Sequence, residues 1–371
     1  MSASSCLTNV KKILILTAGF GQGHNAAARG IRDALARVAP GDAGVALHDP
    51  LAETYPLLFK TVSKAYLIVV DHFPRMWGTV YRWLERKEDF DRDFRKFVRL
   101  KKRLSHLLDH FQPSAVVSVF PSYPYLLDQV AETNRSWKNI VVVTDSITIN
   151  KIWSQAPADY FLLPNEQSAE VMQAGGVPPD KIKVFGFPVS PKFADPWPRR
   201  ENLQPGLRPH VLYMINAGTR QAPGLVRKLL DLEIELTVTV GRDEKLRRAI
   251  EGSAQGKKIN IVGWTDELPR MLCASHLLIG KAGGATVQET IAASCPMIVN
   301  HIVSGQEEGN ARLIEQTNSG AIAFGPEEVL NRIQHAFADD ARQWHEWAAN
   351  IAKLSRPRAS LDIADFLVSL A

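Results

Sequence analysis

Short apolar segments alternate with longer helical patterns along almost the whole chain, and this alternation limits the folds that the sequence can adopt. An apolar run of about four to eight residues is typical of a strand that is covered on both faces. Strands that alternate with helices build a mostly parallel sheet between helical layers, so we predict an α/β fold. The predicted strands are 11–17, 115–120, 140–144, 160–163 and 182–186, followed by 211–216, 235–240, 259–262, 277–280 and 296–300.

A proline-rich stretch between residues 187 and 209 separates the two series of strands and is typical of an interdomain linker. The length of 371 residues also exceeds what one hydrophobic core usually fills. We predict two Rossmann-like domains, which would bind a ligand in a cleft at the carboxyl ends of their strands. The predicted divisions are an N-terminal domain (1–190), a linker (191–209), a C-terminal domain (210–340) and C-terminal helices (341–371) that pack back on the N-terminal domain.

The composition is that of a globular protein, with 45% hydrophobic and 22% charged residues. A net charge of +5 permits an anionic partner, such as a nucleic acid, a lipid surface or a nucleotide. The three cysteines are scattered without metal-ligand spacing, which favours a reducing cytoplasmic compartment. The apolar runs are far shorter than the roughly 20 residues that span a bilayer, and no signal peptide is evident. Any contact with a membrane is therefore expected to be peripheral.

A glycine-rich turn, TAGFGQGH, covers residues 17–24 and precedes a helix predicted over 25–38. Backbone N–H groups at the start of such a helix can face an anion. We therefore interpret Gly21, Gly23 and Asn25 as part of a loop that contacts phosphate or the acceptor substrate.

His24 argues against a dinucleotide site in this turn. Such a site would carry a further glycine here and an acidic residue about 20 positions later on a strand end. The candidate acid, Asp49, follows no convincing strand in the sequence. A histidine at a helix N-terminus is well placed as the general base for a hydroxyl nucleophile, with helix capping or packing as its alternative role.

The second segment with recognisable chemistry, residues 279–310, reads IGKAGGATVQETIAASCPMIVNHIVSGQEEGN. Its glycines lie between a predicted strand and a helix, which is a suitable cradle for a diphosphate. Glu289 lies one turn into that helix, where its carboxylate could accept two ribose hydroxyls. The polar loop that follows offers Gln306, Glu307 and Asn310 to the hydroxyls of a hexose.

The motifs KAGG, CPMI and GQEEGN in this segment resemble the donor domain of glycosyltransferase family 28. The nearest resemblance is to the branch of monogalactosyldiacylglycerol synthases and processive diacylglycerol glucosyltransferases, and it covers residues 11–323. Asn150 departs from the histidine that is frequent in this branch. Further similar motifs are the glycine turn with His24, Thr144–Asp145, Ile152–Trp153, GFPVSPKF (186–193), GRDEKL (241–246) and VGWTDELPRML (262–272).

The resemblance implies a GT-B fold, with two Rossmann-like domains facing across a cleft. It also implies a UDP-hexose donor, inversion at the anomeric carbon, no bound metal and no cofactor, since the UDP-sugar is a substrate. His24 would be the catalytic base, aided by Asp145. The donor-binding residues would be Gly218, Thr219, Gly263, Trp264, Thr265, Lys281, Ala282, Gly283, Gly284, Ala285, Thr286, Glu289, Gln306, Glu307 and Asn310.

Residues 82–103 contain ten Lys or Arg against five Asp or Glu, next to several aromatic residues. This combination suits a segment that lies in anionic lipid headgroups, whereas a solvated charged helix beside buried aromatics is the alternative. The family resemblance favours a protein peripheral on the inner face of the cell membrane. The predicted membrane or acceptor contacts are Phe73, Trp77, Tyr81, Trp83 and Trp153.

The leading interpretation is an enzyme that transfers glucose or galactose from UDP-hexose to diacylglycerol or a related membrane lipid. Its predicted partners are these two substrates and an anionic membrane surface, and no nucleic acid. The alternatives are a lipid-linked peptidoglycan N-acetylglucosaminyltransferase, an epimerase of the same fold, a nucleic-acid-binding protein and a non-catalytic UDP-sugar-binding protein.

Overall fold

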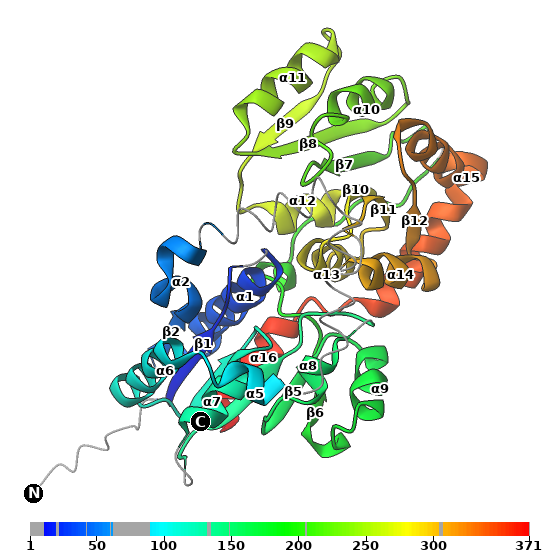
Figure 1. Cartoon of the computed structure of the whole chain (residues 1–371). Helices are drawn as coiled ribbons and strands as arrows, with labels where there is room; N and C mark the ends of the chain where they lie inside the picture. The colour runs from blue at the N-terminus through cyan, green and yellow to red at the C-terminus, as the bar shows by residue number, and fades with distance from the viewer. Residues whose placement is uncertain are drawn as a thin grey trace, which may run out of the picture. The chain divides into compact units, whose positions relative to one another are not determined.

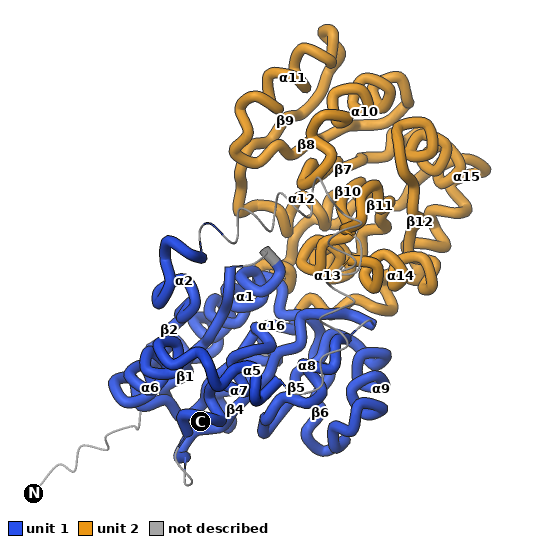
Figure 2. Tube along the Cα trace, in the orientation of Figure 1, with its two compact units in different colours: residues 1–67, 83–191, 358–371 blue, residues 68–82, 192–357 orange. Residues whose placement is uncertain are grey.

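The computed structural model describes residues 11–19, 22–41, 43–59, 61, 90–131, 135–147, 149–204, 206–303 and 307–370. These residues form two compact units (Figure 2). Unit 1 contains the described residues up to 191 together with 358–370, and unit 2 contains residues 192–357 with their gaps. Within the described part of the chain, no helix is both long and apolar enough to cross a bilayer.

Unit 1 is built on a six-stranded parallel sheet with the order β2-β1-β3-β4-β5-β6 (Figure 1). Its strands are β1 (Lys11–Leu16), β2 (Ala43–His48), β3 (Ala115–Ser118), β4 (Lys138–Val142), β5 (Tyr160–Leu163) and β6 (Ile182–Val184). Its helices are α1 (Gln22–Val38), α2 (Pro50–Thr54), α5 (Phe90–Phe94), α6 (Val98–Phe111), α7 (Tyr123–Val130), α8 (Lys151–Ser154), α9 (Glu166–Ala174) and α16 (Ala359–Leu370), with the 3₁₀ turn η1 (Pro179–Lys181).

Strand β2 was not predicted, and the statement that Asp49 follows no strand was wrong. β2 pairs in parallel with β1 from Lys11–Ala43 to Leu16–His48, so Asp49 comes directly after a strand. The segment AGVALH is only half-buried and contains two small residues besides glycine, which gives it a weak strand pattern. Pairing with the apolar strand β1 outweighs that weak local preference.

Helix α1 packs closely on the segment that follows β6. A Cβ atom at Gly30 would lie 2.1 Å from the carbonyl oxygen of Pro188, so only glycine allows this approach. Helix α16, near the end of the chain, packs on the same unit. The ring of Phe366 in this helix contacts the rings of Tyr160 and Phe185, at centroid distances of 5.3 and 5.4 Å. The C-terminal helix is therefore part of the unit 1 core.

Unit 2 contains a second six-stranded parallel sheet, in the order β12-β11-β10-β7-β8-β9. Its strands are β7 (His210–Met214), β8 (Glu235–Gly241), β9 (Asn260–Gly263), β10 (Leu277–Lys281), β11 (Met297–His301) and β12 (Gly320–Ile322). Its helices are α10 (Ala222–Leu229), α11 (Glu244–Ala254), α12 (Leu268–Ala274), α13 (Gly284–Ala292), α14 (Glu308–Gln316) and α15 (Pro326–Leu354), and the 3₁₀ turn η2 (Pro191–Ala194) lies at the boundary along the chain.

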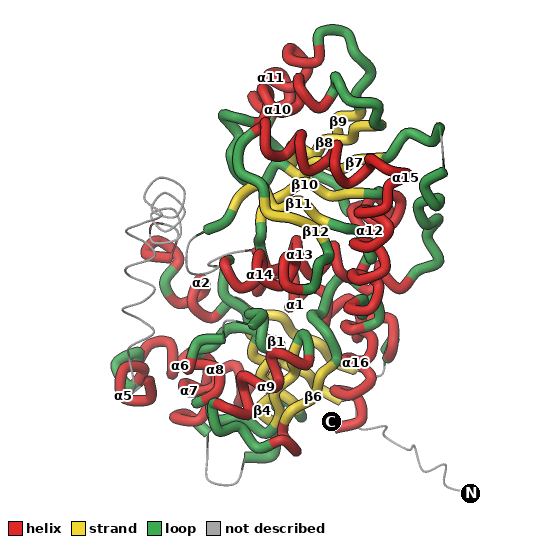
Figure 3. Tube along the Cα trace, turned by 90° about the vertical axis from the view of Figure 1, so that its right-hand side faces the viewer, coloured by secondary structure: helices red, strands yellow, loops and turns green. Residues whose placement is uncertain are grey.

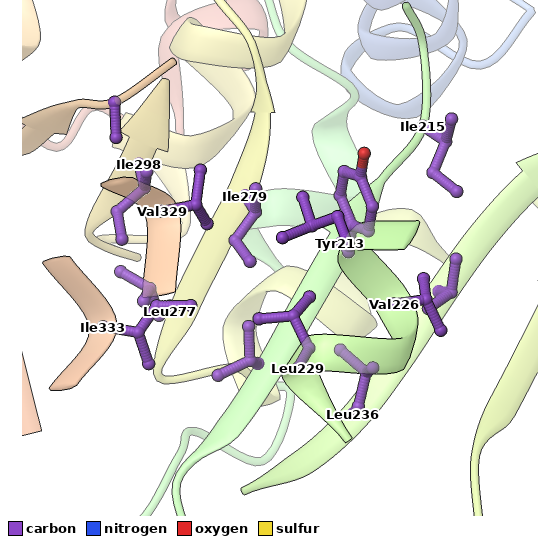
Figure 4. Close-up of a cluster of buried hydrophobic side chains, with 14 of the residues drawn as sticks. Tyr213, Ile215, Val226, Leu229, Leu236, Leu277, Ile279, Ile298, Val329 and Ile333 are labelled. Atoms are coloured by element: carbon purple, nitrogen blue, oxygen red, sulfur yellow. The ribbon is translucent and has the colours of Figure 1, made fainter. Parts of the chain in front are cut away.

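The core of unit 2 is formed where α10 and α15 cover the central strands. Tyr213 and Ile279, on neighbouring strands, are 2% and 0% exposed and lie beside Leu229 and Val329 (Figure 4). In Figure 3 the strands of each unit form a layer with helices packed around it. Both sheets are therefore covered, as the continuous apolar strands require.

The C-terminal segment, predicted as one block over 341–371, is divided between the units. Residues 341–357 belong to unit 2, and only the residues from 358 onward belong to unit 1. Trp344 and Trp347 of α15 are 2% and 4% exposed within the unit 2 core, and this burial holds the segment there.

We expect Gly30→Ala to lower the free energy of unfolding by about 1–3 kcal/mol, the usual cost of overpacking. Gly252, in α11, is the matched control because a Cβ atom there meets no other atom within 4 Å. Gly252→Ala should instead be neutral or stabilising, since alanine favours a helix over glycine. Urea denaturation of both variants measures the difference, and equal stabilities would contradict the close approach.

Candidate active site

The polar groups of unit 1 gather where the order of its strands reverses. The chain proceeds from β1 to β2 on one side of the sheet and then to β3 on the other. The loops that leave β1 and β3 diverge at such a point and create the usual ligand position of doubly wound sheets. His24 follows β1, Val119 follows β3 and Asp145 follows β4, so all three lie at this edge.

His24 lies in the first turn of α1, and the hydrogen bonds of its ring define its tautomer. Its Nδ1 lies 2.7 Å from the carbonyl oxygen of Val119, which can only accept a hydrogen bond. Nδ1 therefore carries the proton of the neutral ring, and Nε2 has the free lone pair. The hydroxyl oxygen of Thr144 lies 3.0 Å from the same Nδ1. The ring also meets Phe120 edge-on, with centroids 5.2 Å apart.

Burial and charge set the protonation state of the pair His24 and Asp145. Burial lowers the pKa of His24 from its ordinary value of 6.5, and the negative charge of Asp145 opposes this effect. Burial likewise raises the pKa of Asp145, against the positive charge of His24 and the hydrogen bond from Trp153. The lowered pKa favours a neutral imidazole near pH 7, which is the form that accepts a proton.

Trp153 is buried, at 1% exposure, and does not lie at the surface. This burial excludes the predicted contact with a membrane, whereas a contact with the acceptor stays a prediction. Its indole Nε1 donates to Oδ2 of Asp145 at 2.8 Å, and it packs in the core between β4, β5 and α9. The hydroxyl of Tyr125 donates to the carbonyl of Ile152 at 2.8 Å and fixes the short helix α8. Trp153 thus orients the carboxylate that faces His24.

Asp49 stabilises the glycine turn after β1 by a hydrogen bond. Oδ2 of Asp49 accepts the N–H of Gly19 at 2.9 Å, while Oδ1 caps α2 by accepting the N–H of Ala52. Asn25 accepts a hydrogen bond from the hydroxyl of Thr17 at 2.9 Å. Asp49 therefore shapes the turn, a role that the sequence did not indicate.

Of the two predicted glycines of this turn, the structure describes only one. Gly21 lies outside the described residues, whereas a Cβ atom at Gly23 would meet nothing within 4 Å. Asn150, which stands in place of a histidine frequent in the similar branch, accepts the N–H of Ile152 at 3.0 Å and caps α8. The four aromatic residues predicted to contact the membrane also lie outside the described residues: Phe73, Trp77, Tyr81 and Trp83.

The corresponding point in unit 2 lies between β7 and β10, where the order of its strands reverses. Strand β10 leads through Ala282 to Gly283, the N-cap of α13, which makes no side-chain capping bond. The N–H groups of the first helical turn have no intrahelical partner. Gly284, Ala285 and Thr286 contribute these groups, and no acidic side chain occupies the turn. The turn can therefore bind an anion.

Glu307 is nearly buried, at 6% exposure, and both of its oxygens have partners. Oε1 accepts the ammonium of Lys281 at 2.5 Å, and Oε2 accepts the N–H of Val303 at 2.9 Å. Asn310 donates from Nδ2 to the carbonyl of Ala282 at 3.1 Å. These residues fasten the polar loop to the glycine turn, which the sequence did not predict. Gln306 lies outside the described residues.

The remaining predicted donor residues surround the same edge of the sheet. Trp264 follows β9 and is 66% exposed, with the guanidinium of Arg242 at 5.0 Å from its ring centroid. Thr265 accepts the N–H of Glu267 at 3.0 Å. Gly218 has a φ of +65°, and Glu289 is half-buried in the second turn of α13. Gly263 ends β9 and Thr219 is exposed in the loop after β7.

Some participating groups had no readable signal in the sequence. The carbonyl of Val119 is a backbone group, and its proximity to His24 depends on the pairing of β1 with β3. Within the ranges that the structure describes, no cluster of three or more His, Cys, Asp or Glu residues is arranged to hold a metal ion.

Two models of known families match the chain. Residues 24–189 match the model described as monogalactosyldiacylglycerol (MGDG) synthase, and residues 215–355 match the glycosyltransferase family 28 C-terminal domain. The processive diacylglycerol beta-glucosyltransferase of Staphylococcus haemolyticus is 27% identical over 88% of this chain and 84% of the relative. The probable chloroplastic monogalactosyldiacylglycerol synthase of Glycine max is 25% identical over 97% of this chain and 71% of the relative.

A solved structure, Os79 from O. sativa in complex with UDP, is similar with a TM-score of 0.60 and 12% identity. The match covers 97% of this chain and 100% of the Os79 chain. At this identity the similarity shows the fold alone, and it confirms the predicted GT-B class of two doubly wound domains.

Replacing Trp153 with Phe should cost about 1–3 kcal/mol in the free energy of unfolding, because the buried Asp145 loses a hydrogen-bond donor. The lost bond also raises the pKa of Asp145, which weakens the support that its charge gives to protonated His24. We therefore expect the pKa of His24 to fall, as measured by NMR titration. Tyr125→Phe, which loosens α8 without touching Asp145, is the control. An equal fall in the pKa of His24 in both variants would show that Trp153 acts only through packing and not through its hydrogen bond to Asp145.

Proposed function

The chain belongs to glycosyltransferase family 28, and from that membership we propose that it transfers a hexose from UDP-hexose to diacylglycerol or a related membrane lipid. The observation that carries the proposal is His24 at the strand reversal of unit 1, where Nδ1 contacts the carbonyl oxygen of Val119 and burial lowers the pKa of the ring. The same chain carries, after β10 of its second sheet, the glycine turn that is typical of this family's donor domain. The hexose is glucose or galactose, since relatives named for both kinds of product are similar to this chain.

We propose that unit 2 binds the donor. The free N–H groups of Gly284, Ala285 and Thr286 would bind the diphosphate, assisted by the positive end of the α13 dipole. Glu289 would accept the ribose hydroxyls, and Gly263–Thr265 would lie beside the uracil. Asn310 would act mainly by holding the carbonyl of Ala282, next to the glycine turn, through its Nδ2.

Gln306 and Glu307 would complete the sugar site, with different tasks. Glu307 already holds Lys281, so its carboxylate would act mainly by fixing the shape of the loop. The ammonium of Lys281 and Oε1 of Glu307 both lie next to Gly283, so this ion pair would shape the diphosphate site without adding net charge to it.

In the proposed reaction, Nε2 of His24 removes the proton of the acceptor hydroxyl. The acceptor oxygen attacks the anomeric carbon on the face opposite UDP, the bond to the diphosphate oxygen breaks, and UDP leaves with both electrons. A single displacement converts an α-linked donor into a β-glycoside. Asp145 stabilises the imidazolium that forms, and the first turn of α13 stabilises the departing diphosphate.

We further propose that unit 1 contacts the membrane near α2 and α6. Five consecutive exposed residues, 95–99, place Phe97 and Val98 between basic side chains at the start of α6. Leu57, just after α2, is 83% exposed, and Arg103 of α6 pairs with Glu53 of α2 at 2.6 Å. Apolar side chains within a basic surface suit an anionic bilayer surface, here the inner face of the cell membrane.

The test of the proposed function is incubation of the protein with UDP-glucose, UDP-galactose or UDP-N-acetylglucosamine and vesicles that contain diacylglycerol. Mass analysis of the extracted lipid should detect a β-linked hexosyl-diacylglycerol with one of the first two donors. A product formed with UDP-N-acetylglucosamine alone, or no product with any donor, would contradict the proposal.

We expect His24→Ala to reduce turnover by at least about 10²-fold, the low end for loss of a general base. UDP affinity should be unchanged, because the proposed donor groups lie in unit 2. The wild-type rate should persist below pH 6.5 and decline only as His24 gains a proton, since burial lowers the pKa of His24. His110→Ala, an exposed histidine of α6, serves as the control and should retain activity. Near-full activity of His24→Ala would remove this residue from catalysis.

Val98→Asp should weaken binding to anionic vesicles by about tenfold, because it removes an apolar side chain worth about 1.5 kcal/mol when buried. Val98 is the first residue of α6, where an acidic residue favours the helix, so the variant should remain folded. Phe324→Asp, at a 56% exposed phenylalanine of unit 2, is the control. Co-sedimentation measures both, and equal losses would contradict a docking role for α6.

A further inference from the structure

A polar cavity of about 380 Å³ lies in unit 2 at the C-terminal end of α13, the end opposite the glycine turn. Its wall includes Arg199, Arg200 and Asn202 of the linker, Ser294 after α13, and Trp344 and His345 of α15. None of the described residues that line it is acidic. The cavity belongs to neither of the proposed substrate sites.

The two arginines bind the carbonyl groups that end α13. Nη1 of Arg199 donates to the carbonyl of Ala293 at 3.1 Å, and Nη2 of Arg200 donates to that of Ser294 at 2.6 Å. Ser355 caps the preceding carbonyl, that of Ala292, at 3.0 Å. This arrangement satisfies the helix end, which carries only about half a negative charge.

The two guanidinium groups carry more positive charge than the partial negative charge of the helix end can neutralise. Arg199 donates elsewhere only to neutral acceptors, including the sulfur of Cys273 at 3.2 Å, and the described residues give neither arginine a carboxylate partner. Arg200 is largely buried, and its burial and the neighbouring charge of Arg199 lower the pKa of its guanidinium. The wall of the cavity therefore carries a net positive charge.

Arg200 also has an unused buried donor. Its Nε makes no hydrogen bond within the described part of the chain, although no solvent reaches it. Its guanidinium lies 5.6 Å from the ring centroid of Trp344, which keeps the group in the wall of the cavity. A buried cationic donor without a partner is costly, and the negative charge of an anion in the cavity would offset part of that cost electrostatically.

We propose that this cavity binds a phosphate group, either the headgroup of an anionic lipid or free phosphate. Planar guanidinium groups match phosphate oxygens with paired hydrogen bonds, and two of them meet at this wall. Asn202 and His345 add further donors. The proposal does not depend on sugar transfer, because it concerns only the charge of this cavity.

Asn202→Asp and His345→Glu test the proposal, because each adds a negative charge to the wall and leaves the contacts between the arginines and α13 in place. Both side chains are exposed, so folding should be unaffected. Asn331→Asp and His335→Glu make the same chemical changes at exposed positions of α15 that do not line the cavity.

Binding of radiolabelled inorganic phosphate is measured by equilibrium dialysis at constant ionic strength, with saturating UDP to occupy the donor turn. A second arm measures sedimentation with vesicles of equal parts phosphatidylglycerol and phosphatidylcholine. We expect the cavity variants to bind at least about tenfold more weakly in one arm, the effect of a repulsion of about 1.4 kcal/mol, while the control variants match the wild type.

A loss confined to dialysis identifies free phosphate as the ligand, and a loss with vesicles identifies a lipid headgroup. The proposal is overturned if the wild type binds in neither arm, or if the cavity variants and the control variants behave alike in both. Because UDP is present throughout, failure of the proposed donor site would change all five proteins equally and remain distinguishable.

Discussion

Parallel strand pairing is the constraint on which both candidate sites depend. Parallel strands place all their carboxyl ends at one edge of the sheet, so residues distant in sequence meet there. The pairing of β1 with β3 and of β3 with β4 brings His24 to Val119 and Asp145. In unit 2, the pairing of β10 with β11 allows Lys281 to reach Glu307. In each unit, the order of the strands therefore determines which positions of the sequence meet at the candidate site.

The same constraint explains which elements could be predicted from sequence. A strand covered on both faces requires a continuous apolar run, and such runs indicated ten of the strands, β1 and β10 among them. β2 and β12 were missed because both lie at sheet edges, are short or rich in small residues, and form by pairing with an apolar neighbour. The division of the C-terminal segment was missed for a related reason, since only packing shows that Trp344 is buried in unit 2.

In the candidate sites, motifs predicted which residues matter but not what they contact. Trp153 was assigned to the membrane or the acceptor because composition does not distinguish an exposed aromatic residue from a buried one, and the structure gives it Asp145 as a partner. Glu307 was assigned to the sugar, but a carboxylate in a polar loop is equally suited to the ammonium of Lys281. Asp49 was set aside for want of a strand that only the sheet supplies.

Helix α13 shows how one element can connect two parts of unit 2. Its N-terminal turn has free N–H groups and no acidic residue, so its positive end remains available to an anion. Its C-terminal carbonyls are bound by Ser355, Arg199 and Arg200, two of which precede β7 in the chain. The positive groups at this end stabilise the negative pole of the helix and hold it in place. A helix fixed at its far end keeps its first turn in a constant position, which a site for a diphosphate requires.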